Sequence, residues 1–381
     1  MFLLFTFFKV SYIINYTFMF MEEYKVKSLK KVLALVLALV LTFCAAACHP
    51  KDETAITING VKFTSAMYLA CMVNAYSEAM QKVNENASTT VTDYTAQTID
   101  NISFNDWVKN RALEQSKQYA ALEALLNEGK FKFSDEDKSE AAEAAEYYWN
   151  SYGYSTLFEK NGVSYNTYKR IVEFSYLSES YFLSLYGKDG TEPVGDDEFN
   201  TALKTNYEQI DRIATSFTDD TTDTEKESKK KSLEDYAAAL NSGKKEFAEV
   251  FQEFNSYSDE DMQNIINNAS SQESAPKDIY STVTGGSKTS YADSNFAAIK
   301  AMDVGTAKVF TASDGNYQLV LRGDIMSDSY YKTALNSEVL HLIKDETFDQ
   351  LINDYIKKAK LSENSYAINR FKPDDIDVSN T

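Results

Sequence analysis

The sequence predicts a mainly helical protein with an inserted small α+β domain that carries a small antiparallel sheet. Apolar residues recur at helical spacing over long stretches of the chain. A linker with glycine and proline at 188–195 divides these stretches. Short runs of strand character follow it, at 210–217, 306–311 and 316–321, and a long helical pattern closes the chain. We find no internal repeat.

Composition is typical of a soluble globular chain. Of its 381 residues, 25% are charged and 44% hydrophobic. This length predicts two or three domains with a sizeable core. The first 47 residues are apolar and form an exception.

The mature part of the chain is strongly acidic. The first 47 residues hold five lysines and two glutamates, so the remainder carries 33 basic and 55 acidic side chains, a net charge of −22. Such a surface repels phosphate backbones, which argues against nucleic-acid binding. A solvated acidic surface that keeps the protein soluble is the simpler interpretation.

The N-terminal region has the layout of a secretory signal peptide. Four lysines between positions 25 and 31 precede an apolar run at 32–41, and small residues follow at 45–47. The apolar run is shorter than the roughly 20 residues of a spanning helix. An earlier apolar stretch at 1–20 is either a membrane helix or an artefact of the assigned start, in which case translation begins at Met21.

Three alanines before Cys48 resemble the lipobox of bacterial lipoproteins, in which the cysteine is lipidated and becomes the mature N-terminus. Ala45 departs from the usual Leu or Val, so plain signal-peptidase cleavage after Ala47 stays open. Cys44, Cys48 and His49 are too few ligands for a structural zinc site, and we expect no metal. Cys71 is interpreted as a small core residue.

The first part of the mature chain begins with an extended turn and a helix. Alternating apolar residues around Asn59-Gly60 predict the turn at 56–63. Thr64 or Ser65 can cap a helix that runs to about residue 84. Residues 85–103, rich in Asn, Thr and Asp, are predicted to form a loop.

Helices continue up to the linker. Helical spacing predicts one over 105–127, stopped by Gly129. Ser134, with a carboxylate three residues on, predicts a capped helix to about Trp149. A short helix at 155–160 and a helix capped by Ser164 that extends to about Tyr186 complete the series.

Beyond the linker the pattern becomes mixed. A helix begins at Asp196 or Asp197, and 210–217 is predicted as a strand. The remaining predicted elements are helices at 224–242 and 244–255, an irregular stretch at 256–294, a short helix at 296–302, a hairpin of 306–311 with 316–321, and a helix over about 330–360.

The order of these parts resembles the PrsA/SurA-type extracytoplasmic foldases, which combine a helical chaperone domain with an inserted parvulin-type peptidyl-prolyl isomerase domain. The segments that carry the resemblance are "INGVKF" (58–63), "FSDEDKSEAAEAAEYYWNSYG" (133–153), "LFEKNGVSYNTYKR" (157–170), "EPVGDDEFNTALKTNYEQ" (192–209), "LNSGKKEFAEVFQEF" (240–254) and "SNFAAIKAMDVGTAKVFTASDGNYQLVL" (294–321).

The resemblance implies a domain plan and a function. It implies a membrane-anchored foldase or holdase on the extracytoplasmic face of the bacterial cell membrane. Its partners would be unfolded or newly exported polypeptides and, through Cys48, membrane lipid; no cofactor is implied. The implied parts are a signal peptide (1–47), a tether (48–55), a SurA N-terminal-like chaperone domain (56–195), a parvulin-like domain (207–323) and a C-terminal helix that packs back on the chaperone domain (328–365).

Two residues depart from the parvulin pattern. Ala214 and Gln318 occupy approximately the positions of its two characteristic histidines, and the chain's only histidines, His49 and His341, lie elsewhere. The catalytic residues are therefore unknown and isomerase activity stays open. The candidate proline-binding cleft consists of Ala214, Phe296, Met302, Phe310, Thr311, Ser313 and Gln318.

Three alternatives remain. An active isomerase is one, since the reaction needs a desolvated pocket for a twisted amide rather than proton transfer to solvent. In the packing alternative, Phe296 and Met302 are ordinary core residues. A lipoprotein that binds a solute or a cell-wall component is the third, although repeated strand-helix units are not seen. Two histidines at the extremes of the chain cannot supply a Ser-His-acid hydrolase site.

Overall fold

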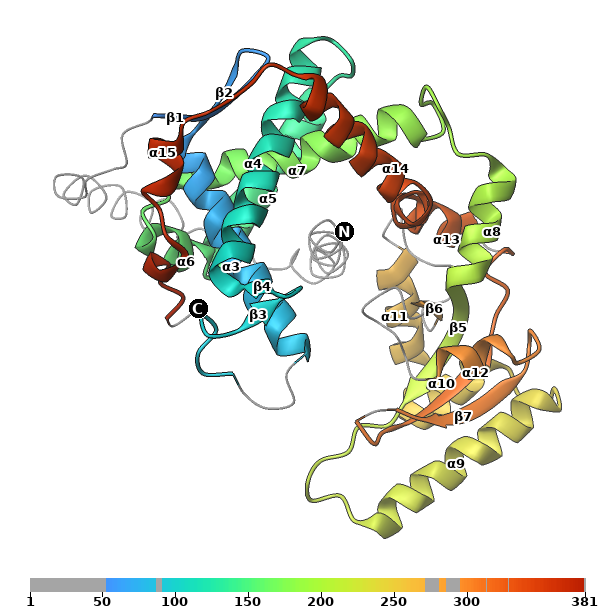
Figure 1. The fold of residues 1–381 in the computed structure, drawn as a ribbon. Helices are drawn as coiled ribbons and strands as arrows, with labels where there is room; N and C mark the ends of the chain where they lie inside the picture. Colours follow the sequence, from blue (N-terminus) through green and yellow to red (C-terminus); the bar gives the residue numbers. More distant parts are fainter. Residues whose placement is uncertain are drawn as a thin grey trace, which may run out of the picture. The chain divides into compact units, whose positions relative to one another are not determined.

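A computed structural model describes residues 53–86, 91–270, 281–285, 295–312, 314–327 and 329–379. The predicted fold class is confirmed, because the described chain is mainly helical and carries small antiparallel sheets. The chain divides into two compact units (Figure 1). The second unit, Val194–Ile343, is inserted into the first, which comprises the chain up to Pro193 and again from Lys344.

The first unit is a set of helices with a three-stranded sheet of order β2-β1-β9. Its strands are β1 (Thr54–Ile58), β2 (Val61–Thr64), β3 (Thr98–Ile99), β4 (Ile102–Ser103) and β9 (Leu361–Glu363). Its helices are α3 (Ser65–Asn86), α4 (Phe104–Asn127), α5 (Asp135–Ser151), α6 (Tyr154–Lys160), α7 (Tyr165–Tyr186), α15 (Ser365–Asn369) and the 3-10 helix η1 (Pro373–Asp375).

A tight Asn-Gly turn joins β1 to β2. Asn59 and Gly60 both have positive φ, 47° and 89°, which is the geometry that a two-residue hairpin turn requires. The Asn59 amide Nδ2 donates to the Tyr355 hydroxyl at 2.8 Å, and the backbone N–H of Lys360 donates to Asn59 Oδ1 at 2.9 Å. The turn is thereby held against the returning C-terminal segment, whose strand β9 pairs antiparallel with β1 (Figure 1).

Local capping sets where the helices of the first unit begin. Ser103, Ser134 and Ser164 are the N-caps of α4, α5 and α7, and each side chain accepts from a backbone N–H in the first helical turn. Packing of aromatic side chains then joins the helices. Tyr119 of α4 stacks on Phe174 of α7, with ring centroids 4.8 Å apart.

The inserted unit is built on a four-stranded antiparallel sheet of order β6-β5-β8-β7. Its strands are β5 (Tyr207–Ala214), β6 (Ser281–Gly285), β7 (Ala307–Thr311) and β8 (Tyr317–Arg322). Its helices are α8 (Asp196–Asn206), α9 (Asp223–Asn241), α10 (Phe247–Asn255), α11 (Asp259–Ser270), α12 (Phe296–Lys300) and α13 (Ser329–Ala334), and α14 (Asn336–Lys358) spans the boundary between the units.

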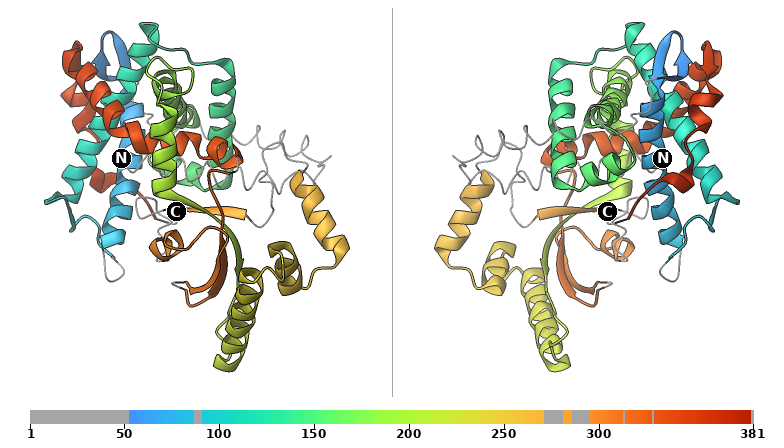
Figure 2. Two further views of the ribbon diagram at one scale, coloured as in Figure 1. Left: turned by 90° about the vertical axis from the view of Figure 1, so that its right-hand side faces the viewer. Right: turned by 90° about the vertical axis from the view of Figure 1, so that its left-hand side faces the viewer.

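The two faces of this sheet are covered by different helices (Figure 2). On one face, Ile213 and Leu319 pack with Leu233 of α9 and Val250 of α10. On the other face, side chains of β5, β7 and β8 pack against Ile299 of α12. This arrangement follows from the alternation of side chains along a strand.

Four sequence predictions need correction. The loop predicted at 85–103 contains the small hairpin β3–β4, and the strand predicted at 210–217 is shifted to 207–214. The stretch at 256–294 that was predicted to be irregular contains α11 and β6. Helix α11 is capped by Ser258, whose side chain accepts from the backbone N–H of Asp261. The single helix predicted at about 330–360, within the implied C-terminal segment 328–365, is two helices that end at Lys358, followed by β9.

The predicted signal peptide, the first part of the tether (48–52) and the lipidation site Cys48 lie outside the described residues, as do Cys44 and His49. The tether was predicted to reach residue 55, but Thr54 and Ala55 already belong to strand β1. Across the described residues, we find no helix that combines the length and the apolar character needed to cross a membrane.

Candidate functional site

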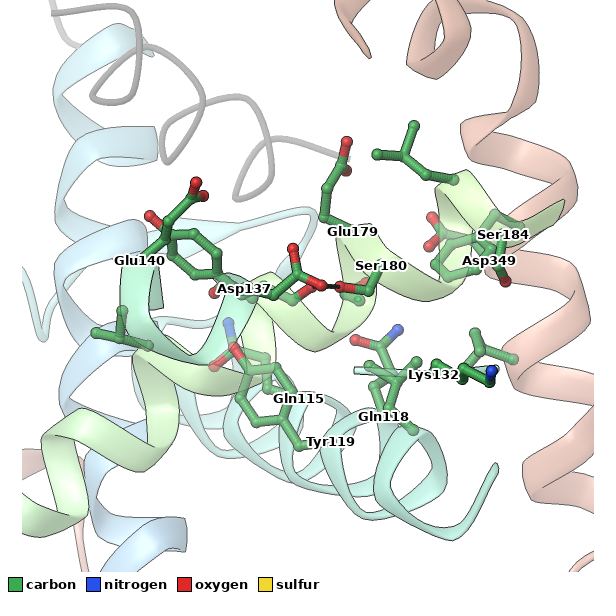
Figure 3. Close-up of a pocket in the computed structure, with 18 of the residues that line it drawn as sticks. Gln115, Gln118, Tyr119, Lys132, Asp137, Glu140, Glu179, Ser180, Ser184 and Asp349 are labelled. Carbon is green, nitrogen blue, oxygen red and sulfur yellow. Dashed lines mark hydrogen bonds between the residues drawn. The ribbon is translucent and has the colours of Figure 1, made fainter. Parts of the chain in front are cut away.

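A cavity of about 700 Å³ lies within the first unit, among α4, α5, α7 and α14 (Figure 3). Cavities of about 300–1,000 Å³ are typical of ligand sites. Apolar and aromatic side chains form part of its wall, namely Tyr119, Leu122, Tyr148, Val172, Tyr176, Leu183, Phe348 and Ile352. The α14 residues that line it follow Lys344 in the sequence, so the whole lining belongs to one unit.

Asp137 positions α5 at the cavity. Its Oδ2 accepts from the backbone N–H of Ser134 at 3.2 Å, which completes the capping box of that helix. The same oxygen accepts from Ser180 Oγ of α7 at 3.1 Å, the bond drawn in Figure 3. A residue that the sequence marks as a helix cap thus also ties two walls of the cavity together.

A buried polar network lies behind the α4 wall. Arg111 donates through Nε to Glu78 Oε2 and through Nη1 to Glu114 Oε2, both at 3.0 Å. Gln115, 3% exposed, donates through Nε2 to Glu78 at 3.5 Å, and its Oε1 has no hydrogen-bond partner within the part of the chain that the structure describes. Burial raises the pKa of Glu78. Gln115 therefore offers a desolvated acceptor at the cavity wall.

Two carboxylates at the cavity have perturbed ionisation. Burial raises the pKa of Asp349, on α14. Burial likewise raises the pKa of Glu140, and neighbouring carboxylates, Asp137 among them, add to the effect. Raised carboxylate pKa values are frequent at binding sites, although buried charge clusters in ordinary structure produce them as well.

The polar groups that the cavity offers are carboxylates, amides, hydroxyls and two cationic side chains. Its lining contains no histidine and no cysteine. Cys71, the free cysteine that the structure describes, is fully buried, and burial raises its pKa to about 12, so its thiol stays protonated. Over the same residues, no cluster of His, Cys, Asp or Glu is suited to hold a metal ion.

The predicted proline-binding cleft maps to the inserted unit. Its residues Ala214 of β5 and Gln318 of β8 are direct partners in the sheet, and Gln318 is also the partner of Phe310 of β7. The structure therefore places these three residues side by side across three strands. Phe310, 7% exposed, is packed in the cluster with Ile299, against which Met302 also lies.

The other predicted cleft residues do not all join this face. Phe296 is the first residue of α12, which covers the same face of the sheet as Phe310. Thr311 is exposed and, one position after Phe310, belongs to the opposite face. Ser313 lies outside the described residues.

The cavity of the first unit was missed by the sequence analysis, because its lining comes from four helices that are distant in sequence. One signal was present. The second half of helix α7 carries Ser175, Ser178, Glu179, Ser180 and Ser184 among apolar and aromatic residues, and all five line the cavity.

No protein-family model matches the chain, and no curated protein matches it. Among solved structures, it is similar to the foldase protein PrsA from Streptococcus pneumoniae str. Canada MDR_19A, with 17% identity over 74% of this chain and 98% of that one, TM-score 0.38. PrsA from Lactococcus lactis shares 14% identity over 83% and 96%, TM-score 0.37. PrsA from Bacillus subtilis shares 18% over 69% and 92%, TM-score 0.32. With identities and TM-scores this low, the function has to be argued from the chain's own residues.

Proposed function

We propose that this protein is an extracytoplasmic folding factor that holds unfolded segments of exported polypeptides in the cavity of its first unit. The observation that carries the proposal is the cavity itself, which is lined by both aromatic side chains and hydrogen-bonding groups. An unfolded chain presents both apolar side chains and unpaired backbone groups, so a site of mixed character suits it. The order of sequence motifs supports the same function.

The proposed location follows from the N-terminal sequence. The lysines before the apolar run at 32–41 and the small residues before Cys48 support export and lipid anchoring at that cysteine. The negative net charge of the mature chain argues against nucleic-acid partners, because it repels phosphate groups. A labelled fatty acid should be incorporated into the wild-type protein and not into Cys48→Ser; equal labelling of both would refute the anchor.

Filling the cavity is expected to abolish most of the holdase activity. Gln118, on α4, lines the cavity and is partly exposed, and in Gln118→Trp the indole would occupy the space that a client needs. We expect about tenfold weaker suppression of aggregation, because the apolar contacts of the client are lost. The measurement is light scattering of a denatured model protein diluted into buffer with the chaperone.

Asn110→Trp is the matched control, since Asn110 is exposed on the same helix and does not line the cavity. Asn353→Trp blocks the cavity from the α14 wall and serves as a second variant. Circular dichroism checks that all three variants are folded. Wild-type suppression by both folded cavity variants would refute the proposed site.

Active prolyl isomerisation is the alternative, and the register that joins Ala214, Gln318 and Phe310 favours a proline contact in the inserted unit. We expect a proline-peptide assay to return the uncatalysed rate, because Ala214 and Gln318 replace both characteristic histidines and preorganised polar groups supply much of enzymatic catalysis. A faster rate that both Gln318→Ala and Phe296→Ala remove would establish the isomerase instead.

A further inference from the structure

The cavity of the first unit is acidic. Its lining carries six carboxylates, Glu114, Asp137, Glu140, Glu179, Asp189 and Asp349, and two cationic side chains, Arg111 and Lys132. All four helices contribute carboxylates, and Figure 3 labels Asp137 and Glu140 of α5, Glu179 of α7 and Asp349 of α14. The excess of negative charge is therefore a property of the cavity as a whole.

The cationic lining residues do not neutralise this excess. Arg111 is already engaged by Glu78 and Glu114, at 3.0 Å each. Lys132 is exposed, and water screens the charge of an exposed ammonium. Burial raises the pKa of Asp349, and the neighbouring carboxylates Asp345 and Glu114 act in the same direction, although Arg111 opposes them.

Gln115 supplies a second and independent observation. Only 3% of the surface of Gln115 is exposed, and the residue lines the cavity beside Tyr119 (Figure 3). Its Oε1 is an acceptor without a donor among the residues that the structure describes. An unpaired buried acceptor is costly, and a ligand that brings an N–H group would satisfy it.

The aromatic lining suits the same kind of ligand. Tyr119, Tyr148 and Tyr176 contribute to the wall. Faces of aromatic rings attract ammonium and guanidinium groups, most strongly where water is excluded. Their rings also pack on the aliphatic stems of lysine and arginine.

We infer that the cavity selects polypeptide segments through a basic side chain, with arginine preferred, whose guanidinium donates to Asp349, while an N–H group elsewhere in the segment donates to Gln115. Arginine is preferred because its planar group carries five N–H donors, whereas lysine carries three on a single nitrogen. This inference rests on the proposed function and names the chemical class of segment that the site takes.

Three labelled peptides, identical except for a central arginine, citrulline or glutamate, test the inference against the purified full-length protein. Citrulline keeps the shape of arginine and removes its charge. By fluorescence anisotropy we expect the arginine peptide to bind about tenfold more tightly than the citrulline peptide, as for a hydrogen bond to a charged group, and the glutamate peptide to bind most weakly.

Asp349→Asn should reduce the arginine preference to about twofold, because the shape of the side chain is kept while its charge is lost. Glu346→Gln is the matched control, since Glu346 is exposed on the same helix and does not line the cavity; it should keep the full preference. Circular dichroism confirms that both variants are folded.

The possible outcomes separate the two proposals. Equal affinity for the arginine and citrulline peptides, with binding that Gln118→Trp abolishes, would overturn the charge selection and leave the folding function intact. An arginine preference that Asp349→Asn leaves unchanged would overturn the assigned contact. Failure of all three peptides to bind would overturn both the selection and the cavity as a polypeptide site.

Discussion

Replacing Phe182 with alanine is expected to lower the free energy of unfolding of the first unit by about 3–5 kcal/mol. Phe182 is fully buried in α7, and its ring meets that of Phe348 on α14 edge to face, with centroids 5.3 Å apart. The substitution leaves a void that rigid helices fill only in part. It also removes a main contact that holds the returning helix at the cavity wall.

Urea unfolding followed by tryptophan fluorescence measures this loss, because both tryptophans of the sequence, Trp107 and Trp149, belong to the first unit. Phe182→Leu keeps most of the volume and should cost about 1 kcal/mol. Tyr366→Ala, at a side chain that is 74% exposed, should change stability by less than about 0.5 kcal/mol. Equal losses for Phe182→Ala and Tyr366→Ala would contradict the buried contact between Phe182 and Phe348.

Removing the Glu78 carboxylate is expected to cost about 3 kcal/mol. Glu78 and Arg111 form an ion pair at 3.0 Å whose side chains are only 11% and 16% exposed. In Glu78→Leu the guanidinium stays buried with Glu114 as its remaining partner, and a buried charge that loses its partner is strongly destabilising. The remaining contact with Glu114 places the expected loss at the lower end of the usual range.

The double variant Glu78→Leu/Arg111→Met separates the pair from its surroundings. Replacing both charges with apolar side chains of similar size should return stability to within about 1 kcal/mol of the wild type. The comparison is a double-mutant cycle in urea. If the double variant is less stable than Glu78→Leu alone, the loss comes from packing rather than from an uncompensated charge.

Elements with local signals could be predicted from the sequence. The Asn59-Gly60 turn and the helices that begin after Ser134 and Ser164 were predicted, because their capping and turn residues act within four positions of the chain. Helix α11 was missed although Ser258 and Asp261 form a local cap at its start, and strand β6 was not predicted. The strand Ser281–Gly285 is defined by its pairing with β5, more than 60 residues earlier, which no local pattern reports.

The candidate sites likewise differ in how far the sequence alone could predict them. Ala214 and Gln318, two residues of the predicted cleft, are direct partners in the sheet, and their role in binding proline stays a prediction. The cavity depends on Gln115, Asp137, Ser180 and Asp349, which come from four helices. Local patterns mark Asp137 as a helix cap and Ser180 as part of a polar cluster, but only tertiary packing brings these four residues together.

The pairing of β1 with β9 sets an order on the folding of this protein as it is synthesised. Ile58 of β1 pairs with Leu361 of β9, so about 300 further residues must be synthesised before β1 can pair with β9. The inserted unit, Val194–Ile343, has emerged in full by then. Because domains generally fold as units while the chain is produced, the second unit can reach its fold first, and the first unit closes last, around a finished insertion.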